Sequence, residues 1–292
     1  MSLPLLIGIT FNGLAMGLTY ALLSMGLILL IRATGVLNFA QGDLVTMGGF
    51  VTFWFLYTLK LPMIPGLIAS ILVFAATAIM FMFVTYLPVR NNRWAQTRMV
   101  CTMGASVIIK ELLPMLTTYT TRSMPAPVPG ALRIGMAAIS YHYILIMGVC
   151  LFVMLLTWLL FDKLYAGRAM MAAAQNPFAA ELIGIPVVIT IAATYMIVFS
   201  VAGIAGWLIV PTFALNNTLN LYQTRAFAGC VIGGFGDLKG ALIGSVMIGL
   251  VEGYATLVTS LYKDVVVYAL LIIVLLLRPA GLFSGGRVGV KV

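Results

Sequence analysis

The sequence predicts an all-α fold, a polytopic membrane helical bundle with about eight spans plus one broken or re-entrant segment. Hydrophobic residues make up 63% of the chain and charged residues only 8%, whereas soluble domains carry about 25% charged residues. The apolar residues fall in runs of about 20, the length of a membrane-spanning helix. Basic residues, 16 against 7 acidic ones, stand at the ends of these runs, as the positive-inside rule describes.

Eight apolar runs are long enough to cross a bilayer: 3–31, 36–57, 64–87, 97–116, 141–161, 187–211, 240–259 and 260–277. A further stretch, 222–234, is too short to span alone and is predicted to be a half-helix or re-entrant segment. No linker, low-complexity run or soluble appendage interrupts the sequence, so we expect a single transmembrane domain over residues 1–292. The first run has no basic residues ahead of it and is predicted to be a retained span.

Two groups of basic residues predict which ends of the spans are cytoplasmic. One lies between the third and fourth runs and the other follows the last run: Arg90, Arg93 and Arg98, then Arg278, Arg287 and Lys291. Two crossings after the first group bring the chain back to the same side. Residues 162–186 are therefore predicted to be cytoplasmic.

The stretch 165–186, YAGRAMMAAAQNPFAAELIGIP, is the least membrane-like part of the chain. Asn176 can cap a short helix, and Pro177 suits its first position because proline has no N–H to lose. Gly184 can end the helix in a left-handed conformation. A short capped helix outside the bilayer predicts a docking surface for another protein.

Three polar residues, Asn38, Gln41 and Asp43, sit between two apolar runs that leave almost no aqueous loop. Irregular polar backbone at membrane depth is tolerated where it is buried in protein or lines a cavity. One interpretation is therefore a polar lining of a translocation path. The other is a tight turn at the surface, which the neighbouring Arg32 favours.

Charged residues also fall inside the predicted spans. Lys110 and Glu111 are predicted to lie near the outer interface, with Lys110 reaching toward water. Glu252 lies between Gly249 and Gly253 and is predicted to make a hydrogen bond between helices, with contact to the pathway as the alternative.

Small residues four apart predict faces on which helix backbones approach closely. Besides the Ala202 and Gly206 pair, the predicted packing glycines are Gly13, Gly17, Gly236, Gly240, Gly244, Gly249 and Gly253. The breaks at 38–43 and 233–237 occupy comparable places in the two halves, a pattern typical of inverted repeats around a transport path.

Several kinds of site are absent from the sequence. There is no GxxxxGK[ST] motif, and the glycines at 233–236 lack the third glycine of a dinucleotide fingerprint. The one histidine, His142, has no catalytic or metal-ligand cluster around it in the sequence. We therefore expect no catalytic residue, no metal site and no cofactor on this chain.

Five ordered motifs resemble the LivH-type permease family of branched-chain amino acid ABC importers, over essentially the whole chain. They are FNGLAMGLTYALLSMGL at 11–27, LNFAQGDLVTMGGF at 37–50, YAGRAMMAAAQNPFAAELIGI at 165–185, IGGFGDLKGALIGSVMIGLVEG at 232–253 and LLLRPAGLF at 275–283. The chain departs from the family pattern at Gln41, where histidine is usual, and at Asp237 and Lys239, which replace serine and proline. These departures affect the expected substrate more than the expected fold.

The resemblance implies an ABC importer permease fold and a transport subunit rather than an enzyme, in the bacterial plasma (inner) membrane. The expected cargo is branched-chain amino acids or similar small polar solutes. The expected partners are a second permease subunit, a paralogue rather than another copy, two cytoplasmic ATPases that hold ATP and Mg, and a periplasmic or extracellular solute-binding protein. No nucleic acid is expected.

In this family the segment 162–186 couples the spans to the ATPases. The residues carried over to that role are Gly167, Arg168, Ala169, Asn176, Pro177, Glu181 and Gly184. Arg168 and Glu181 are candidates for polar contacts with an ATPase groove; the alternative is that they are only solvated. A different class, an ion-coupled secondary transporter or channel without an ATPase, would need a buried ion site, and its candidates, Asp43, Glu111 and Glu252, are scattered.

Overall fold

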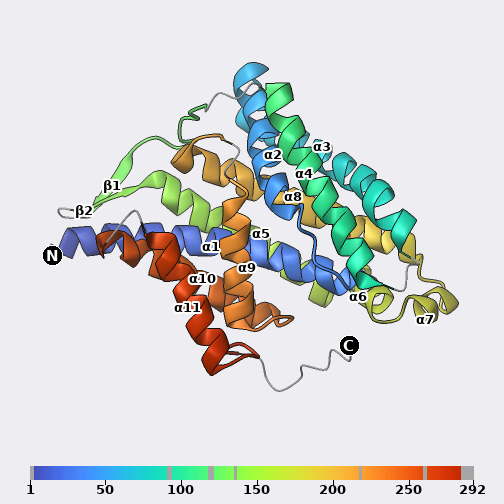
Figure 1. Ribbon diagram of the computed structural model, residues 1–292. Coiled ribbons are helices and arrows are strands. Elements are labelled where there is room, and N and C mark those ends of the chain that lie inside the picture. Colours follow the sequence, from blue (N-terminus) through green and yellow to red (C-terminus); the bar gives the residue numbers. More distant parts are fainter. Residues whose placement is uncertain are drawn as a thin grey trace. The chain divides into compact units, whose positions relative to one another are not determined.

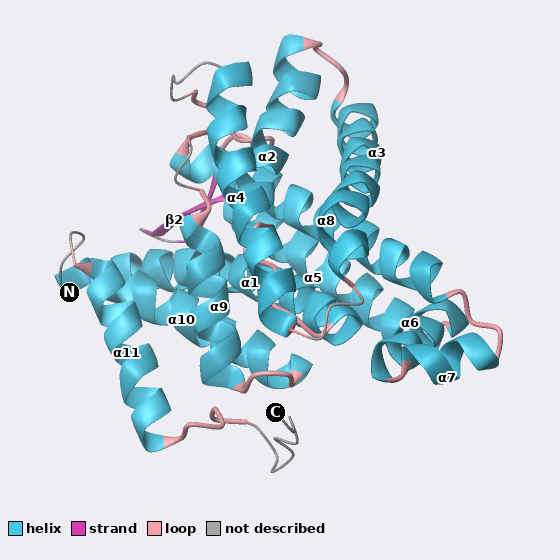
Figure 2. Cartoon of the chain, turned by 45° about the vertical axis from the view of Figure 1, so that its right-hand side comes forward, coloured by secondary structure: helices cyan, strands magenta, loops and turns pink. Residues whose placement is uncertain are grey.

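The computed structural model describes residues 3–90, 94–117, 122–134, 137–216, 219–258 and 262–283. Helices dominate it, and the two short strands form one hairpin (Figures 1 and 2). The predicted helical membrane bundle is thereby confirmed. Three basic residues used for the topology prediction, Arg93, Arg287 and Lys291, lie outside the described residues.

Five of the predicted runs form helices that are long and apolar enough to cross a membrane: Pro4–Thr34, Met63–Val89, Tyr141–Lys163, Val187–Phe213 and Leu238–Leu257. The other three predicted runs are also helical: α2 (Gln41–Phe53) continued by η1 (Trp54–Thr58), α4 (Ala95–Thr117) and α11 (Lys263–Leu277). The number of membrane crossings stays a prediction.

The second predicted run was placed wrongly at its start, since the chain is helical only from Gln41 onward. Gly35 has a positive φ of 72°, and the Asn38 side chain accepts a hydrogen bond from the Ala40 N–H at 3.1 Å. Such local side-chain bonds compete with helix formation. An irregular segment, 35–40, therefore precedes α2.

The chain groups into two compact units, each made of separate stretches. Unit 1 comprises Met1–Ile28, Pro125–Phe152 and Tyr222–Val292, and unit 2 comprises Leu29–Met124 and Val153–Leu221. Two helices, α1 (Leu3–Thr34) and α5 (Tyr141–Lys163), contribute to both units. The single domain over 1–292 stays a prediction.

In unit 1, α1 packs closely on α10 (Leu238–Val258) through the predicted glycines. A Cβ added at Gly13 would lie 2.9 Å from the Gly249 carbonyl oxygen, and one at Gly17 would lie 2.9 Å from the Val246 Cα. Gly253 faces Gly13 in the same contact. This confirms the close helix approach that the small-residue spacing predicts.

The short helix α9 (Leu221–Gly233) packs on α10 through Gly240 and Gly244, which face its last turns. The prediction for Gly236 is wrong. An added Cβ there would meet no atom within 4 Å, and the residue has a φ of 97°, so the α9–α10 turn rather than helix packing accounts for this glycine. Unit 1 also contains the hairpin of β1 (Ala131–Ile134) and β2 (Ala137–Ser140), paired antiparallel.

In unit 2, α8 (Val187–Phe213) packs against both α2 and α3 (Met63–Phe81), which continues as η2 (Met82–Tyr86) and η3 (Leu87–Val89). A Cβ added at Gly48 would lie 2.6 Å from the Gly203 Cα, and Gly206 faces the Val45 carbonyl. The α2 and α8 backbones therefore touch. The α3–α8 contact is aromatic, with the rings of Phe81 and Phe199 edge to face at 5.1 Å.

Candidate functional site

The predicted cytoplasmic segment forms two short helices, α6 (Tyr165–Gln175) and α7 (Pro177–Leu182). The Asn176 side chain accepts a hydrogen bond from the Ala179 N–H at 3.0 Å, and Pro177 is the first residue of α7. Gly184 leaves the helix with a φ of 84°. The start and stop signals predicted for this helix are therefore confirmed.

One face of α6 is buried and packs on α8. Gly167 and Ala169 lie on this face, and a Cβ at Gly167 would run into the Leu160 carbonyl at the end of α5. Both residues were assigned to the coupling of the spans to the ATPases, and that role stays a prediction. Packing within the chain occupies the side they face.

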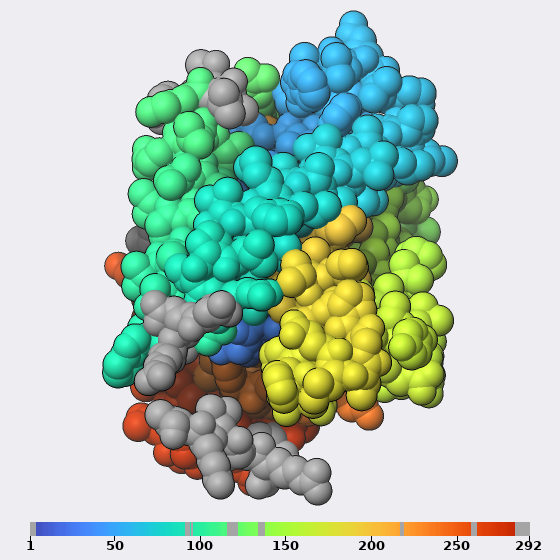
Figure 3. Space-filling model, turned by 90° about the vertical axis from the view of Figure 1, so that its right-hand side faces the viewer, coloured from blue at the N-terminus to red at the C-terminus, as the bar shows by residue number. Residues whose placement is uncertain are grey.

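The outward side of the two helices carries several large apolar side chains together with both predicted charged contacts. We call these residues the α6–α7 surface: Tyr165, Arg168, Phe178, Glu181, Leu182 and Ile183. Phe178 is 72% exposed. In the space-filling view this part of the chain, coloured yellow-green to yellow, lies on the visible face (Figure 3). Exposed apolar side chains gathered in one place mark an interaction surface.

The three polar residues before and within the first turn of α2 are buried, including Gln41, with 0% exposure, and Asp43, with 3%. Burial of this kind is inconsistent with the predicted alternative of a surface turn. The two charged residues of the neighbouring helix α4, Lys110 and Glu111, are exposed, and their predicted place near the outer interface stays a prediction.

Asp43 joins three parts of unit 2. One carboxylate oxygen accepts a hydrogen bond from the Ser106 hydroxyl on α4, and the other accepts one from the Asn220 side-chain amide at 3.3 Å. Asn220 directly precedes α9, which begins at Leu221. The sequence reasoning missed both partners, although the polar letters NNTLN at 216–220 between two apolar runs were a usable signal.

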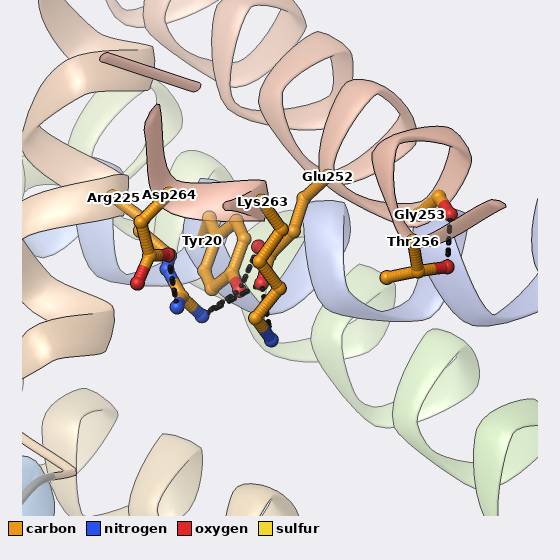
Figure 4. Close-up of polar contacts among 7 residues, drawn as sticks. All are labelled: Tyr20, Arg225, Glu252, Gly253, Thr256, Lys263 and Asp264. Atoms are coloured by element: carbon orange, nitrogen blue, oxygen red, sulfur yellow. Dashed lines mark hydrogen bonds and ion pairs between the residues drawn. The ribbon is translucent and has the colours of Figure 1, made fainter. Parts of the chain in front are cut away.

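In unit 1, the buried Glu252 lies within a polar cluster that extends to the partly exposed Lys263 and Asp264 (Figure 4). The Tyr20 hydroxyl donates a hydrogen bond to the Glu252 Oε2 at 2.7 Å, which confirms the predicted hydrogen bond between helices. Its Oε1 also forms ion pairs with Arg225 at 2.8 Å and Lys263 at 3.3 Å. Glu252 therefore carries more contacts than the sequence predicts.

Arg225 is the residue of this cluster that the sequence reasoning missed. Its side chain is 6% exposed, and besides Glu252 it pairs with Asp264 at 2.6 Å and donates to the Tyr20 hydroxyl at 3.3 Å. An arginine inside a short apolar run is a functional or structural signal by itself. The charged members of the cluster are two cations, Arg225 and Lys263, and two anions, Glu252 and Asp264, so its formal charges balance. This geometry fits a structural tie among α1, α9, α10 and α11.

No group of three or more His, Cys, Asp or Glu residues suited to a metal ion occurs in the part of the chain that the structure describes. Unit 2 therefore holds two candidate functional features, the α6–α7 surface and the buried Asp43 with its partners. Unit 1 holds the Arg225–Glu252 cluster, whose geometry fits a structural role.

A comparison with protein families matches residues 9–275 to the family described as the permease component of branched-chain amino acid transport systems. The chain is 31% identical to the high-affinity branched-chain amino acid transport system permease protein BraD of Pseudomonas aeruginosa, over 94% of each protein. It is 30% identical to the LivH permease protein of Salmonella typhimurium, also over 94% of each. A solved structure, PsaBC from Streptococcus pneumoniae in complex with Fab, covers 90% of both chains at a TM-score of 0.48 and 14% identity.

Proposed function

The chain belongs to the family of permease components of branched-chain amino acid transport systems, and from this premise we propose that it is the transmembrane permease subunit of an ATP-driven importer. The protein is a multi-pass membrane protein, and five helices of its described part are long and apolar enough to span a bilayer. The proposed cargo is branched-chain amino acids or similar small polar solutes, and the proposed location is the bacterial plasma (inner) membrane.

The α6–α7 surface is the single observation that carries this proposal. Helices of 11 and 6 residues are too short to cross a bilayer, yet they expose Phe178, Leu182 and Ile183. A rigid, capped helix pair with apolar side chains facing outward suits insertion into a groove of another protein. An ATPase that docks there could move the spans, because α6 packs directly on α8.

The complete transporter would contain four kinds of subunit. We propose a second permease, a paralogue of this chain, two cytoplasmic ATPases that hold ATP and Mg and carry out hydrolysis, and a solute-binding protein outside the membrane. Transport would then require two packings of the helix bundle that differ little in energy, biased by the ATPases and the loaded binding protein.

The test is to change the outward residues and measure how much ATPase subunit co-purifies with the chain. Phe178→Asp places a charge in the apolar part of the surface, and Arg168→Glu reverses its positive charge. We expect both variants to lose the ATPase and ATP-dependent leucine uptake while the chain stays folded. Phe235→Asp is the matched control, because Phe235 is also an exposed phenylalanine (46%) but lies in the α9–α10 turn.

Unchanged co-purification and uptake in both variants would remove the docking role. The alternative function, an ion-coupled carrier or channel, makes the opposite prediction for the isolated chain. Proteoliposomes that contain this chain alone should then take up solute without ATP, whereas the importer hypothesis predicts no uptake until the ATPases are added.

A further inference from the structure

Asp43 is a buried carboxylate that no basic side chain contacts among the residues that the structure describes. Its partners, Ser106 and Asn220, are neutral donors, and none of the described basic residues of unit 2 forms an ion pair with it. Glu252 in unit 1 has the same burial, at 6% exposure, but two cations contact it. Only one of the two buried carboxylates is therefore matched in charge.

A carboxylate removed from water is unfavourable unless a counter-charge or strong hydrogen bonds replace its hydration. Asp43 is the third residue of α2, where the helix end contributes partial positive charge. Together with the two hydrogen bonds, this offsets part of the cost of burying the carboxylate. The helix end does not supply a whole positive charge.

Two buried polar groups close to Asp43 in the chain have no hydrogen-bond partner among the described residues. They are the Thr46 hydroxyl, one turn further along α2, and the Asn38 side-chain amide nitrogen before the helix. The hydroxyl can accept a hydrogen bond and the amide can donate one. In native structures unsatisfied buried groups of this kind call for an explanation, and a ligand that passes through is one.

Lys110 is a basic residue that could neutralise the charge of Asp43. It lies one turn beyond Ser106 on α4 and acts on Asp43 electrostatically, but it does not contact the carboxylate and its side chain is exposed. A solvated ammonium at longer range is screened by water. Lys110 therefore does not neutralise Asp43 by direct contact.

We propose that Asp43 is a specificity-determining residue of this permease, and that its carboxylate binds the ammonium group of the solute during passage. This inference rests on the function proposed above. It predicts that the path favours solutes with a protonated amine and disfavours carboxylic acids that lack one, since an uncompensated carboxylate repels anions.

The experiment uses the whole transporter, with ATPases and binding protein, in proteoliposomes supplied with radiolabelled leucine. Asp43→Asn keeps the shape and removes the charge, with its oxygen able to accept from Asn220 and its amide able to donate to the Ser106 hydroxyl. We expect leucine uptake to fall roughly 10- to 100-fold, the effect of losing a hydrogen bond to a charged group, with ATPase co-purification unchanged. Asp43→Glu should recover part of the uptake. Glu111→Gln, which neutralises an exposed carboxylate on α4, is the control and should leave uptake unchanged.

Other outcomes overturn the proposal in distinguishable ways. Normal uptake by Asp43→Asn would refute it while leaving the importer function standing, whereas no ATP-dependent uptake by the unaltered transporter would refute both. Loss of ATPase co-purification in Asp43→Asn would indicate a structural role. A matching loss in Lys110→Met would make Lys110 the functional partner. Loss of wild-type uptake when N-methylglucamine replaces sodium and potassium would assign the site to an alkali cation instead.

Discussion

The Arg225–Glu252 pair makes the clearest stability prediction. At the observed separation of 2.8 Å, the gross Coulomb attraction is about 6 kcal/mol for an effective dielectric constant of about 20. The cost of dehydrating both charges opposes most of this, and removal of one partner from a buried pair typically costs about 3–5 kcal/mol. Arg225→Met leaves Glu252 buried but still paired with Lys263 and Tyr20. We therefore expect the free energy of unfolding to fall by about 3 kcal/mol.

Equilibrium unfolding in mixed micelles with increasing SDS measures this change. Lys163→Met is the matched control, because the Lys163–Asp162 pair at 3.4 Å is exposed on both sides and should contribute less than about 1 kcal/mol. The double variant Arg225→Met with Glu252→Met removes both charges and should be more stable than the single variant. A single-variant loss no larger than that of the control, or costs that simply add in the double variant, would refute the reasoning.

Two further predictions concern glycines and the α7 cap. Gly48→Ala should lower the free energy of unfolding by about 1–3 kcal/mol, because its Cβ would lie 2.6 Å from the Gly203 Cα. Gly104→Ala should raise the free energy of unfolding by about 0.5–1 kcal/mol, because nothing lies within 4 Å of the added Cβ. The same SDS titration compares the two variants. Asn176→Ala should destabilise α7 locally by about 1 kcal/mol and speed hydrogen exchange at the Ala179 amide, which its side chain now binds. Unchanged exchange there would contradict the cap.

Features that depend on neighbouring residues in the chain could be predicted from the sequence. The Asn176 cap and the turn at Gly184 need only a few adjacent positions, and the apolar runs need only their length and composition. The contact between α1 and α10 was also accessible, because Gly13 and Gly249 each sit in a small-residue repeat. In each case the residues that form the sequence pattern are the same residues that make the structural feature.

Features that depend on partners far apart in the chain could not be predicted in the same way. Arg225 contacts a tyrosine 205 residues away, and nothing near Arg225 in the sequence indicates which acidic residues neutralise it. The same holds for Asp43 and Asn220, which are 177 residues apart. A single sequence shows that a buried charge needs a partner, but only the fold shows which one.

Two carboxylates that the sequence groups together as pathway candidates therefore separate once their surroundings are known. Glu252 is neutralised by residues of its own unit, so its removal should disturb the packing of α1, α9, α10 and α11 before it disturbs transport. Among the described residues Asp43 accepts hydrogen bonds from neutral donors, so on the proposal made above its neutralisation should affect the solute more than the fold. In an apolar medium a permanently buried charge must be matched by the protein, whereas a charge that binds a passing cation must stay unmatched until that cation arrives. On this proposal, charge balance, more than burial, separates the structural carboxylate Glu252 from the solute-binding carboxylate Asp43.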